Sequence, residues 1–287
     1  MHFAYRPLHS RFGVEIIGAD LTRPIGGDAF AEIRSAFDTH SLLLFRGPVL
    51  TDDQHFAFSQ RFGRVQISFS ANQSGGSYFS RQSNIDMATN EIMPPDHRLM
   101  VYQKGNRMWH SDSSYRPSGS LCSILSAQIV PPEGGNTEFA SLRVAWDDLP
   151  AQEKNKLDGL VVGHSIAYSR RLSDPGALTP EQEAEMPPTR HLLVQTNPAN
   201  GRKSLFIGSH ASHIEGWPIE EGRRYLAELM ERATPPEAVY SHPWQEGDIV
   251  VWDNRCLLHR ATPFNTGRHR RLMQRTTVAD GIVPLGA

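Results

Sequence analysis

The amino-acid sequence predicts a mostly β protein, a β-sandwich or jelly roll with peripheral helices. Short apolar runs of strand length, rich in Val, Ile, Leu and Thr, recur along the 287-residue chain between frequent glycines and prolines. Helical patterns are fewer, and they do not alternate with these runs as a doubly wound parallel sheet would require. Many short strands with a few helices outside them are typical of sandwiches and jelly rolls.

Several segments have the length and composition of strands. They are 13–21, 41–47, 120–130, 191–196, 204–208, 248–253 and 270–278. Other segments place apolar residues at helical spacing. They are 28–40, 51–63, 141–149, 151–160 and 218–233. Thr51 is a suitable N-cap followed by acidic residues, and Pro218 precedes two glutamates, as is usual where helices begin.

The bulk composition narrows the class of protein. We expect one domain over residues 1–287, because a chain of this length buries most of its surface without covalent staples. The 29 basic and 31 acidic residues nearly cancel, which favours neither nucleic acid nor a membrane as a partner. Two distant cysteines, Cys122 and Cys256, exclude a disulfide framework and a zinc ribbon. The N-terminal segment has no apolar run of signal-peptide length, so we expect a cytoplasmic protein.

Two long polar stretches lack periodicity, 66–107 and 169–188. Loops of this length in a compact domain are usually functional or disordered. One interpretation is mobile surface loops, and the other is a cover over a binding site. We predict lid-like insertions near both stretches.

The segment NRMWHSDSSY places His110 and Asp112 two positions apart. Side chains alternate along a strand, so the pair would lie on one face. Two histidines and one carboxylate on one face, with the other positions open, are the ligand set of non-heme Fe(II) oxygenases. With 13 histidines in the chain, about one such pair is expected by chance, and a second, His213 with Glu215, does occur. The pair therefore needs support from elsewhere in the chain.

His259 and two arginines supply that support. A strand-like run precedes His259, which would complete the ligand set. Arg271 and Arg275 would share a strand face, and their apolar and β-branched neighbours favour an interior position. Arginine is suited to bidentate binding of a carboxylate. We therefore predict an iron ligand followed by an interior pair of guanidinium groups.

The remaining cluster of ligand-type residues contains His210, His213 and Glu215. It could be a second metal site, or its side chains could make local hydrogen bonds before the helix at 218–233. Such clusters more often have the structural role, which we favour here.

The sequence resembles the Fe(II)/2-oxoglutarate-dependent dioxygenases of the taurine and 2,4-dichlorophenoxyacetate group. The resemblance covers essentially the whole chain and is densest in segments that carry ordered motifs. They are WHSDSSY (109–115), PPEGGNTEF (131–139), GRKSLFIGSHASHIEG (201–216), and WQEGDIVVWDNRCLLHRA through RRLMQRTTV (244–278). The HASHIEG and WDNRC stretches are most similar to the aryloxyalkanoate branch. The implied fold is a double-stranded β-helix, a cupin-like jelly roll, which agrees with the strand-rich pattern.

The resemblance also implies roles for individual residues. His110, Asp112 and His259 would bind iron. Thr137 and Arg271 would hold the far carboxylate of 2-oxoglutarate. Further candidates, for contact with the substrate or its acid group, are Arg275, Ser114, Tyr115, Asn72 and Arg170.

The implied reaction is hydroxylation of a small anionic organic acid, with ether cleavage if the acid is an aryloxyalkanoate. Its cosubstrates would be 2-oxoglutarate and O2, and its metal Fe(II). The resemblance also implies a homo-oligomer. A sulfonate, an amino acid or a biosynthetic intermediate are alternative substrates, because the first part of the 66–107 stretch is neutral until Arg81 whereas the lids of herbicide-cleaving relatives carry basic residues. An alternative of another class is a metal-binding isomerase, hydrolase or non-catalytic barrel.

Overall fold

The structure, a computed structural model, describes residues 2–282 and 285. Seven strands form the main sheet, in the spatial order β1–β2–β3–β13–β5–β15–β4. Their bounds are Ala4–Pro7 (β1), Val14–Ile17 (β2), Leu42–Phe45 (β3), Ile249–Asp253 (β13), Ser120–Ile129 (β5), Leu272–Ala279 (β15) and Ser80–Ser83 (β4). Neighbours are antiparallel except β2 and β3, which run parallel.

A smaller antiparallel sheet faces the main sheet, with the order β12–β6–β14. Its strands are Val239–His242 (β12), Thr137–Ser141 (β6) and Leu257–Ala261 (β14). One apolar cluster joins both sheets, with Leu125 and Met273 from the main sheet packed with Phe139 and Leu257 from the smaller one. Two mainly antiparallel sheets around a shared core make a jelly roll, so the predicted fold class is confirmed.

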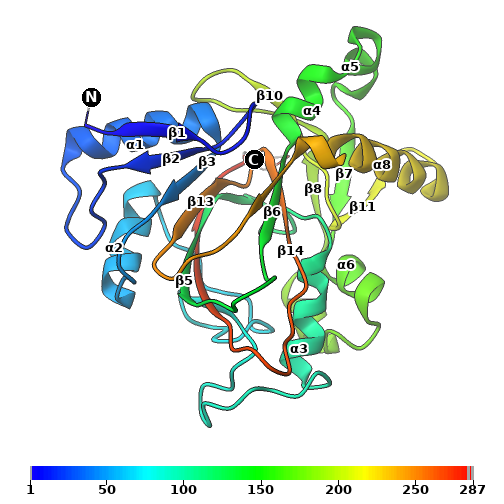
Figure 1. The fold of residues 1–287 in the computed structure, drawn as a ribbon. Helices are drawn as coiled ribbons and strands as arrows, with labels where there is room; N and C mark the ends of the chain where they lie inside the picture. The colour runs from blue at the N-terminus through cyan, green and yellow to red at the C-terminus, as the bar shows by residue number, and fades with distance from the viewer. Residues whose placement is uncertain (1, 283–284, 286–287) are drawn as a thin grey trace.

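The strands of the main sheet bury alternate residues on opposite faces. In β13, Val250 and Trp252 point into the jelly roll, whereas Val251 belongs to the cluster on the outer face. Two helices cover that outer face, α1 (Gly27–His40) and α2 (Asp52–Phe62) (Figure 1). Because helices cover one face and the second sheet covers the other, the central strands β3 and β13 are continuous apolar runs in the sequence.

A third layer covers the smaller sheet. Its helices are α4 (Leu142–Asp148), α5 (Ala151–Leu157) and α8 (Ile219–Ala233). Its remaining strands are Val161–His164 (β7), Thr189–Leu192 (β8), Val194–Thr196 (β9), Lys203–Leu205 (β10) and Ala211–Ile214 (β11). They pair as β11–β7–β8 and β10–β9. Apolar residues of α4, α8 and β7 pack with Leu258 of β14 in one cluster.

Each predicted helix and strand is present, with shifts at the ends. Thr51 caps α2 as expected, in a capping box with Gln54. The run 191–196 divides between β8 and β9, because Leu193 leaves both ladders. Several strands were not predicted, among them β6 and β14. Their short sequences, TEFAS and LLHRA, mix polar and apolar residues without a clear period.

The two polar stretches contain short elements rather than loop alone. The first holds β4, the helix α3 (Arg98–Gln103) and the 3-10 helix η1 (Lys104–Arg107). The second overlaps α6 (Ile166–Ser173) and contains α7 (Pro180–Glu185). The lid role and the single-domain organisation remain predictions. Within residues 2–282 and 285, no helix combines the length and the apolar character needed to cross a membrane.

Candidate metal centre

His110 and His259 lie directly opposite each other in an antiparallel bridge. The His110 N–H donates to the His259 carbonyl at 3.1 Å, and the His259 N–H donates to the His110 carbonyl at 2.9 Å. This pairing brings two residues that are far apart in the chain to a ring separation of 4.2 Å. The Nδ1 atom of His110 bonds the Met108 carbonyl at 2.8 Å, which leaves its Nε2 for a metal.

Asp112 reaches the two histidines from a turn, not from the predicted strand. The expected strand carrying both His110 and Asp112 is wrong: His110 is a bridge residue, and the chain turns at Asp112. Ser113, at φ 57°, takes the left-handed conformation in that turn. The turn directs the carboxylate back toward the two imidazoles.

The three residues lie close enough together to coordinate a single metal ion. One ligand atom from each of His110, Asp112 and His259 lies within 4.8 Å of the others, and no other such group occurs in the described chain. All three side chains are buried, with exposed fractions of 5 to 6 %. Two imidazoles and one carboxylate are the facial triad of non-heme Fe(II) oxygenases.

The charges of the triad suit a divalent cation. Burial lowers the pKa of His110 to about 4 and that of His259 well below its usual value, so both imidazoles are neutral at pH 7. Burial raises the pKa of Asp112, but the Arg275 guanidinium and the two imidazoles outweigh it and hold that pKa below its usual range. Neutral imidazoles and an ionised carboxylate are the forms that bind a metal.

Ser123 and Asn254 hold the carboxylate in place. The Ser123 hydroxyl donates to Asp112 Oδ2 at 2.7 Å and accepts from the Asn254 side-chain amide at 3.0 Å. The Asn254 carbonyl oxygen accepts the backbone N–H of Asp112 at 3.1 Å and the Trp252 indole N–H at 2.9 Å. Ser123 was not predicted from the sequence, because nothing distinguishes it within the apolar run of β5.

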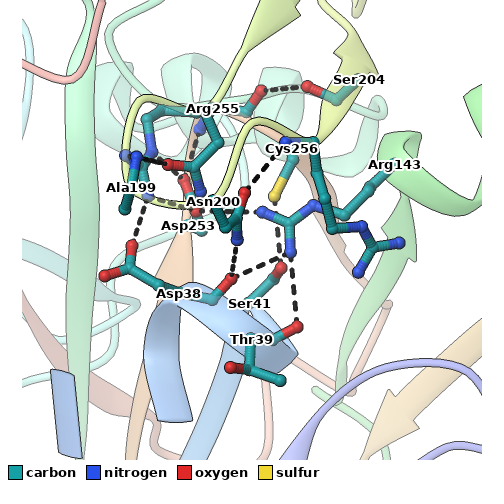
Figure 2. Close-up of polar contacts among 12 residues, drawn as sticks. Asp38, Thr39, Ser41, Arg143, Ala199, Asn200, Ser204, Asp253, Arg255 and Cys256 are labelled. Carbon is teal, nitrogen blue, oxygen red and sulfur yellow. Dashed lines mark hydrogen bonds and ion pairs between the residues drawn. The ribbon is translucent and has the colours of Figure 1, made fainter. Parts of the chain in front are cut away.

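A buried ionic network fixes the turn between β13 and β14 (Figure 2). Arg255 donates to both carboxylate oxygens of Asp253, at 2.8 and 2.7 Å, and to Asp38 at the end of α1, at 3.1 Å. Arg143 of α4 approaches Asp253 at 3.8 Å and donates to the Asp38 carbonyl. The turn that precedes His259 is thus tied to helices on both sides of the jelly roll.

A cavity of about 100 Å³ opens beside the metal centre. His110 and His259 line it, together with Thr137 and Arg271. Arg271 is 8 % exposed, its Nε has no partner, and its NH2 donates to the Gly135 carbonyl at 3.1 Å. Burial alone lowers the pKa of Arg271 to about 10, because no acidic side chain of the described residues compensates it. A guanidinium buried in this way, without an acidic partner among the described residues, favours an anion beside it.

Arg275 lies between the metal centre and the same cavity. One guanidinium N–H donates to Asp112 Oδ1 at 2.5 Å, and the side chain lines the cavity wall. It also lines a second, smaller cavity of about 20 Å³. The interior position predicted for both arginines agrees with the structure, in which Arg271 is buried and Arg275 is partly buried.

The other candidates for substrate contact lie outside the first cavity. Asn72 and Tyr115 line the smaller one. The Ser114 hydroxyl bonds His210 Nδ1 at 3.0 Å, and Arg170 donates to the Asn106 side chain at 3.0 Å. Substrate contact by these four residues remains a prediction.

The second histidine cluster makes hydrogen bonds and ion pairs, as favoured from the sequence. His213 bonds the Ser212 hydroxyl at 2.9 Å, and Glu215 pairs with Arg190. His210 nevertheless lies close to the metal centre, with its ring 5.9 Å from that of His110. Its distance along the chain from His110 concealed this proximity.

Residues 4–277 match the model of the taurine catabolism dioxygenase TauD, TfdA family. The chain is 40 % identical, over 99 % of its length and 100 % of the relative's, to an alpha-ketoglutarate-dependent 2,4-dichlorophenoxyacetate dioxygenase of Cupriavidus pinatubonensis. It is 34 % identical to an (S)-phenoxypropionate/alpha-ketoglutarate-dioxygenase of Sphingobium herbicidovorans, over 96 % of this chain and 95 % of the relative. The crystal structure of AAD-2 in complex with Mn(II) and N-oxalylglycine has a TM-score of 0.90 and 37 % identity, with full coverage of both chains.

The fold and the facial triad define a 2-oxoglutarate-dependent dioxygenase. The chain belongs to the TauD, TfdA family, which confirms the resemblance found in its sequence. Membership of a dioxygenase family excludes the isomerase, hydrolase and binding-barrel alternatives.

Proposed function

We propose that this protein is an Fe(II)- and 2-oxoglutarate-dependent dioxygenase that hydroxylates an aryloxyalkanoic acid next to its ether oxygen. The resulting hemiacetal then breaks down to a phenol and a carbonyl compound. One observation carries this proposal: a cavity lined by both histidines of the buried triad also contains two interior arginines and, among its described lining residues, no carboxylate.

The cavity residues fit 2-oxoglutarate. Arg271 is a buried cation without an acidic partner in the described chain, so the far carboxylate of 2-oxoglutarate would supply the missing charge. Thr137 Oγ1 accepts the Trp244 indole N–H at 3.0 Å, which leaves the threonine hydroxyl hydrogen to donate to the same carboxylate. Trp244 was not expected in this role, which is to orient Thr137.

The triad fits a metal that must keep open positions. His110 and His259 line the cavity, so the open positions of a metal bound to the triad would be reached from it. Bound Fe(II), with 2-oxoglutarate and O2, would supply the oxidising power, and 2-oxoglutarate would leave as succinate and CO2. Ser123 and Arg275 each take one oxygen of Asp112, which limits rotation of the carboxylate.

Arg275 supports an acidic substrate. Its guanidinium faces the metal centre and keeps N–H groups beyond the one that bonds Asp112. It would bind the substrate carboxylate or the C1 carboxylate of 2-oxoglutarate. The curated relatives named for phenoxy acids share 34 to 40 % of residues with this chain, which favours an aryloxyalkanoate over an amino acid.

A cytoplasmic location and a homo-oligomeric state are further parts of the proposal. Both cysteines are free and buried, which is usual in a reducing compartment. Size-exclusion chromatography with light scattering tests the oligomeric state directly.

Oxygen uptake by the Fe(II)-loaded protein tests the proposed function. We expect strong stimulation by 2-oxoglutarate together with phenoxyacetate or 2-phenoxypropionate, with equal amounts of succinate and phenol released. Stimulation by alkylsulfonates or amino acids instead would redirect the substrate class. No 2-oxoglutarate-dependent uptake with any acid would contradict the proposal.

Substitution Arg271→Met tests the 2-oxoglutarate site. We expect at least a tenfold rise in the 2-oxoglutarate KM, because a hydrogen-bonded charge pair of about 1.5–3 kcal/mol is lost. The thermal stability of the ligand-free protein should not fall, because the substitution removes a buried cation that has no counter-charge. Arg270→Met, which removes the exposed neighbour, is the control. An unchanged KM would assign the carboxylate to another residue.

A further inference from the structure

Two cations stand at the mouth of the cavity beside the metal centre. Lys104 and Arg107, both in η1, line that cavity and are exposed, whereas Arg271 on its inner wall is buried. Among the described residues, neither Lys104 nor Arg107 takes part in an ion pair, and no residue lining the cavity is acidic. The 66–107 stretch, neutral in its first part, thus contributes positive charge at its end.

The interior charges balance without these two side chains. This charge balance rests on the proposed function, because it counts Fe(II), 2-oxoglutarate and an acidic substrate. Fe(II) with Arg271 and Arg275 would carry four positive charges, which Asp112, 2-oxoglutarate and one substrate carboxylate would neutralise. Lys104 and Arg107 then remain without counter-charges beside a low-dielectric cavity. A second anionic group on the substrate would pair with them.

A buried arginine fixes the segment that carries the two cations. Arg170 of α6 is 6 % exposed, lies 4.4 Å from the Tyr102 ring centroid, and donates to the Asn106 side chain. Its guanidinium fills the space beside Gly105, where a Cβ would lie 1.7 Å from one of its nitrogens. η1 is therefore held against α6 from within the protein.

Hydrogen bonds also hold this segment to the main sheet. The Asn106 amide donates to the Gln82 side chain at 2.7 Å, and Gln103 donates to the Ser83 carbonyl at 2.9 Å. Both acceptors belong to β4, which pairs with β15, the strand that carries Arg275. The two exposed cations are thus anchored at a fixed place on the cavity mouth, unlike lysines and arginines on a free surface.

We infer that Lys104 and Arg107 select a dianionic substrate. Its first acid group enters toward the metal centre, and its second, a carboxylate or sulfonate at the opposite end, pairs with the two cations at the cavity mouth. Arg170 acts through η1 as a positioning residue for the two cations.

Matched ligands separate charge from shape. The 3- and 4-carboxyphenoxyacetates carry the second charge, and the corresponding carbamoyl compounds have the same shape without it. Calorimetry on protein loaded with Mn(II) and N-oxalylglycine measures their Kd without turnover. Adipate and its monoamide repeat the comparison on an alkyl scaffold. Steady-state oxygen uptake measures the same preference in turnover, as the kcat/KM of the dianion divided by that of its amide.

In the wild-type protein we expect at least one dianion to bind about tenfold more tightly than its amide, which is about 1.4 kcal/mol. The double variant Lys104→Met with Arg107→Met should bring this ratio close to one. Both residues are exposed, so the variant should fold normally, which circular dichroism checks. Arg98→Met, an exposed cation of α3 outside the cavity lining, should keep the wild-type ratio.

Each outcome bears on the inference separately from the proposed function. A wild-type ratio near one, a ratio unchanged in the double variant, or no binding of either pair would overturn the inference. The proposed function would still stand if 2-oxoglutarate-dependent oxygen uptake occurred with a monoacid. It would fail if no acid of either type supported such uptake.

Discussion

At the scale of single residues, the carboxylate of Asp112 depends on partners from separate strands. Ser123 of β5 and Arg275 of β15 each donate a hydrogen bond to one of its two oxygens. Asn254 lies in the turn after β13. Its side chain accepts a hydrogen bond from the backbone N–H of Asp112 and donates one to the Ser123 hydroxyl. The orientation of the metal ligand is therefore set by residues that do not themselves bind metal.

Removal of one such partner should weaken metal binding. In Asn254→Ala, we expect the affinity for Fe(II) or Mn(II) to fall about 10- to 100-fold, because Asp112 and Ser123 lose the amide that orients them. Competition with a chelator measures the affinity. Asn155→Ala, which removes an exposed amide on α5, is the matched control. Equal affinity in both variants would show that Asn254 does not position the ligand.

At the scale of elements, the turn between β13 and β14 decides where His259 lies. The apolar face of β13 packs in the jelly-roll core, but the direction of β14 depends on the turn. Within that turn, the Arg255 side chain donates hydrogen bonds to Asp253 and to Asp38 of α1, so it ties the turn to that helix (Figure 2). The register of β14 against β6 then places His259 opposite Phe139.

Breaking this network should destabilise the whole fold. We expect Arg255→Met to lower the free energy of unfolding by about 3–5 kcal/mol, because it leaves the Asp253 carboxylate buried without its main partner. Denaturant titration measures the change. Arg232→Met removes a pair with Glu153 that is more exposed and should cost less than about 1 kcal/mol. Similar losses in the two variants would contradict the importance assigned to the buried network.

At the scale of the whole molecule, the layers bury histidines as well as apolar residues. His55 lies between α2 and the main sheet, and His164 lies in β7 against His191 and Phe206. Burial lowers the pKa of His55 to about 4; burial and the neighbouring His191 lower that of His164 to about 3. A histidine with a lowered folded-state pKa binds its proton more readily when unfolded, so acid favours unfolding.

The stability of the protein should therefore fall as the pH drops from 7 to 5. His164 alone contributes about 2 kcal/mol to that fall, because its unfolded form titrates near pH 6.5 and its folded form stays neutral. In His164→Phe we expect the difference in unfolding free energy between pH 7 and pH 5 to shrink by this amount. The partly exposed His269, changed to Phe, is the control. An equal difference in wild type and His164→Phe would refute this origin.

The sequence by itself determined the class of fold and most of the chemistry. The central strands β3 and β13 are covered on both faces, so each is a local apolar run in the sequence. The start of α2 could be predicted from its N-cap, Thr51. Ligand types at set positions, His110, Asp112 and His259, indicated a facial triad. The apolar runs, the helix cap and the His110–Asp112 pair are each encoded within a few neighbouring residues, where composition and spacing can express them.

Only the tertiary structure decided which distant residues meet. The bridge joins His110, an isolated bridge residue, to His259 in β14, a short strand without a clear period. The turn at Asp112 replaces the expected strand. The interior place of Arg271 was predicted from alternation, but its lack of a counter-charge was visible only once its surroundings were known. Likewise, Lys104 and Arg107 are ordinary charged residues in the sequence. Their proposed role in binding a second acid group follows only from the packing of η1 against Arg170, which places them at the mouth of the cavity.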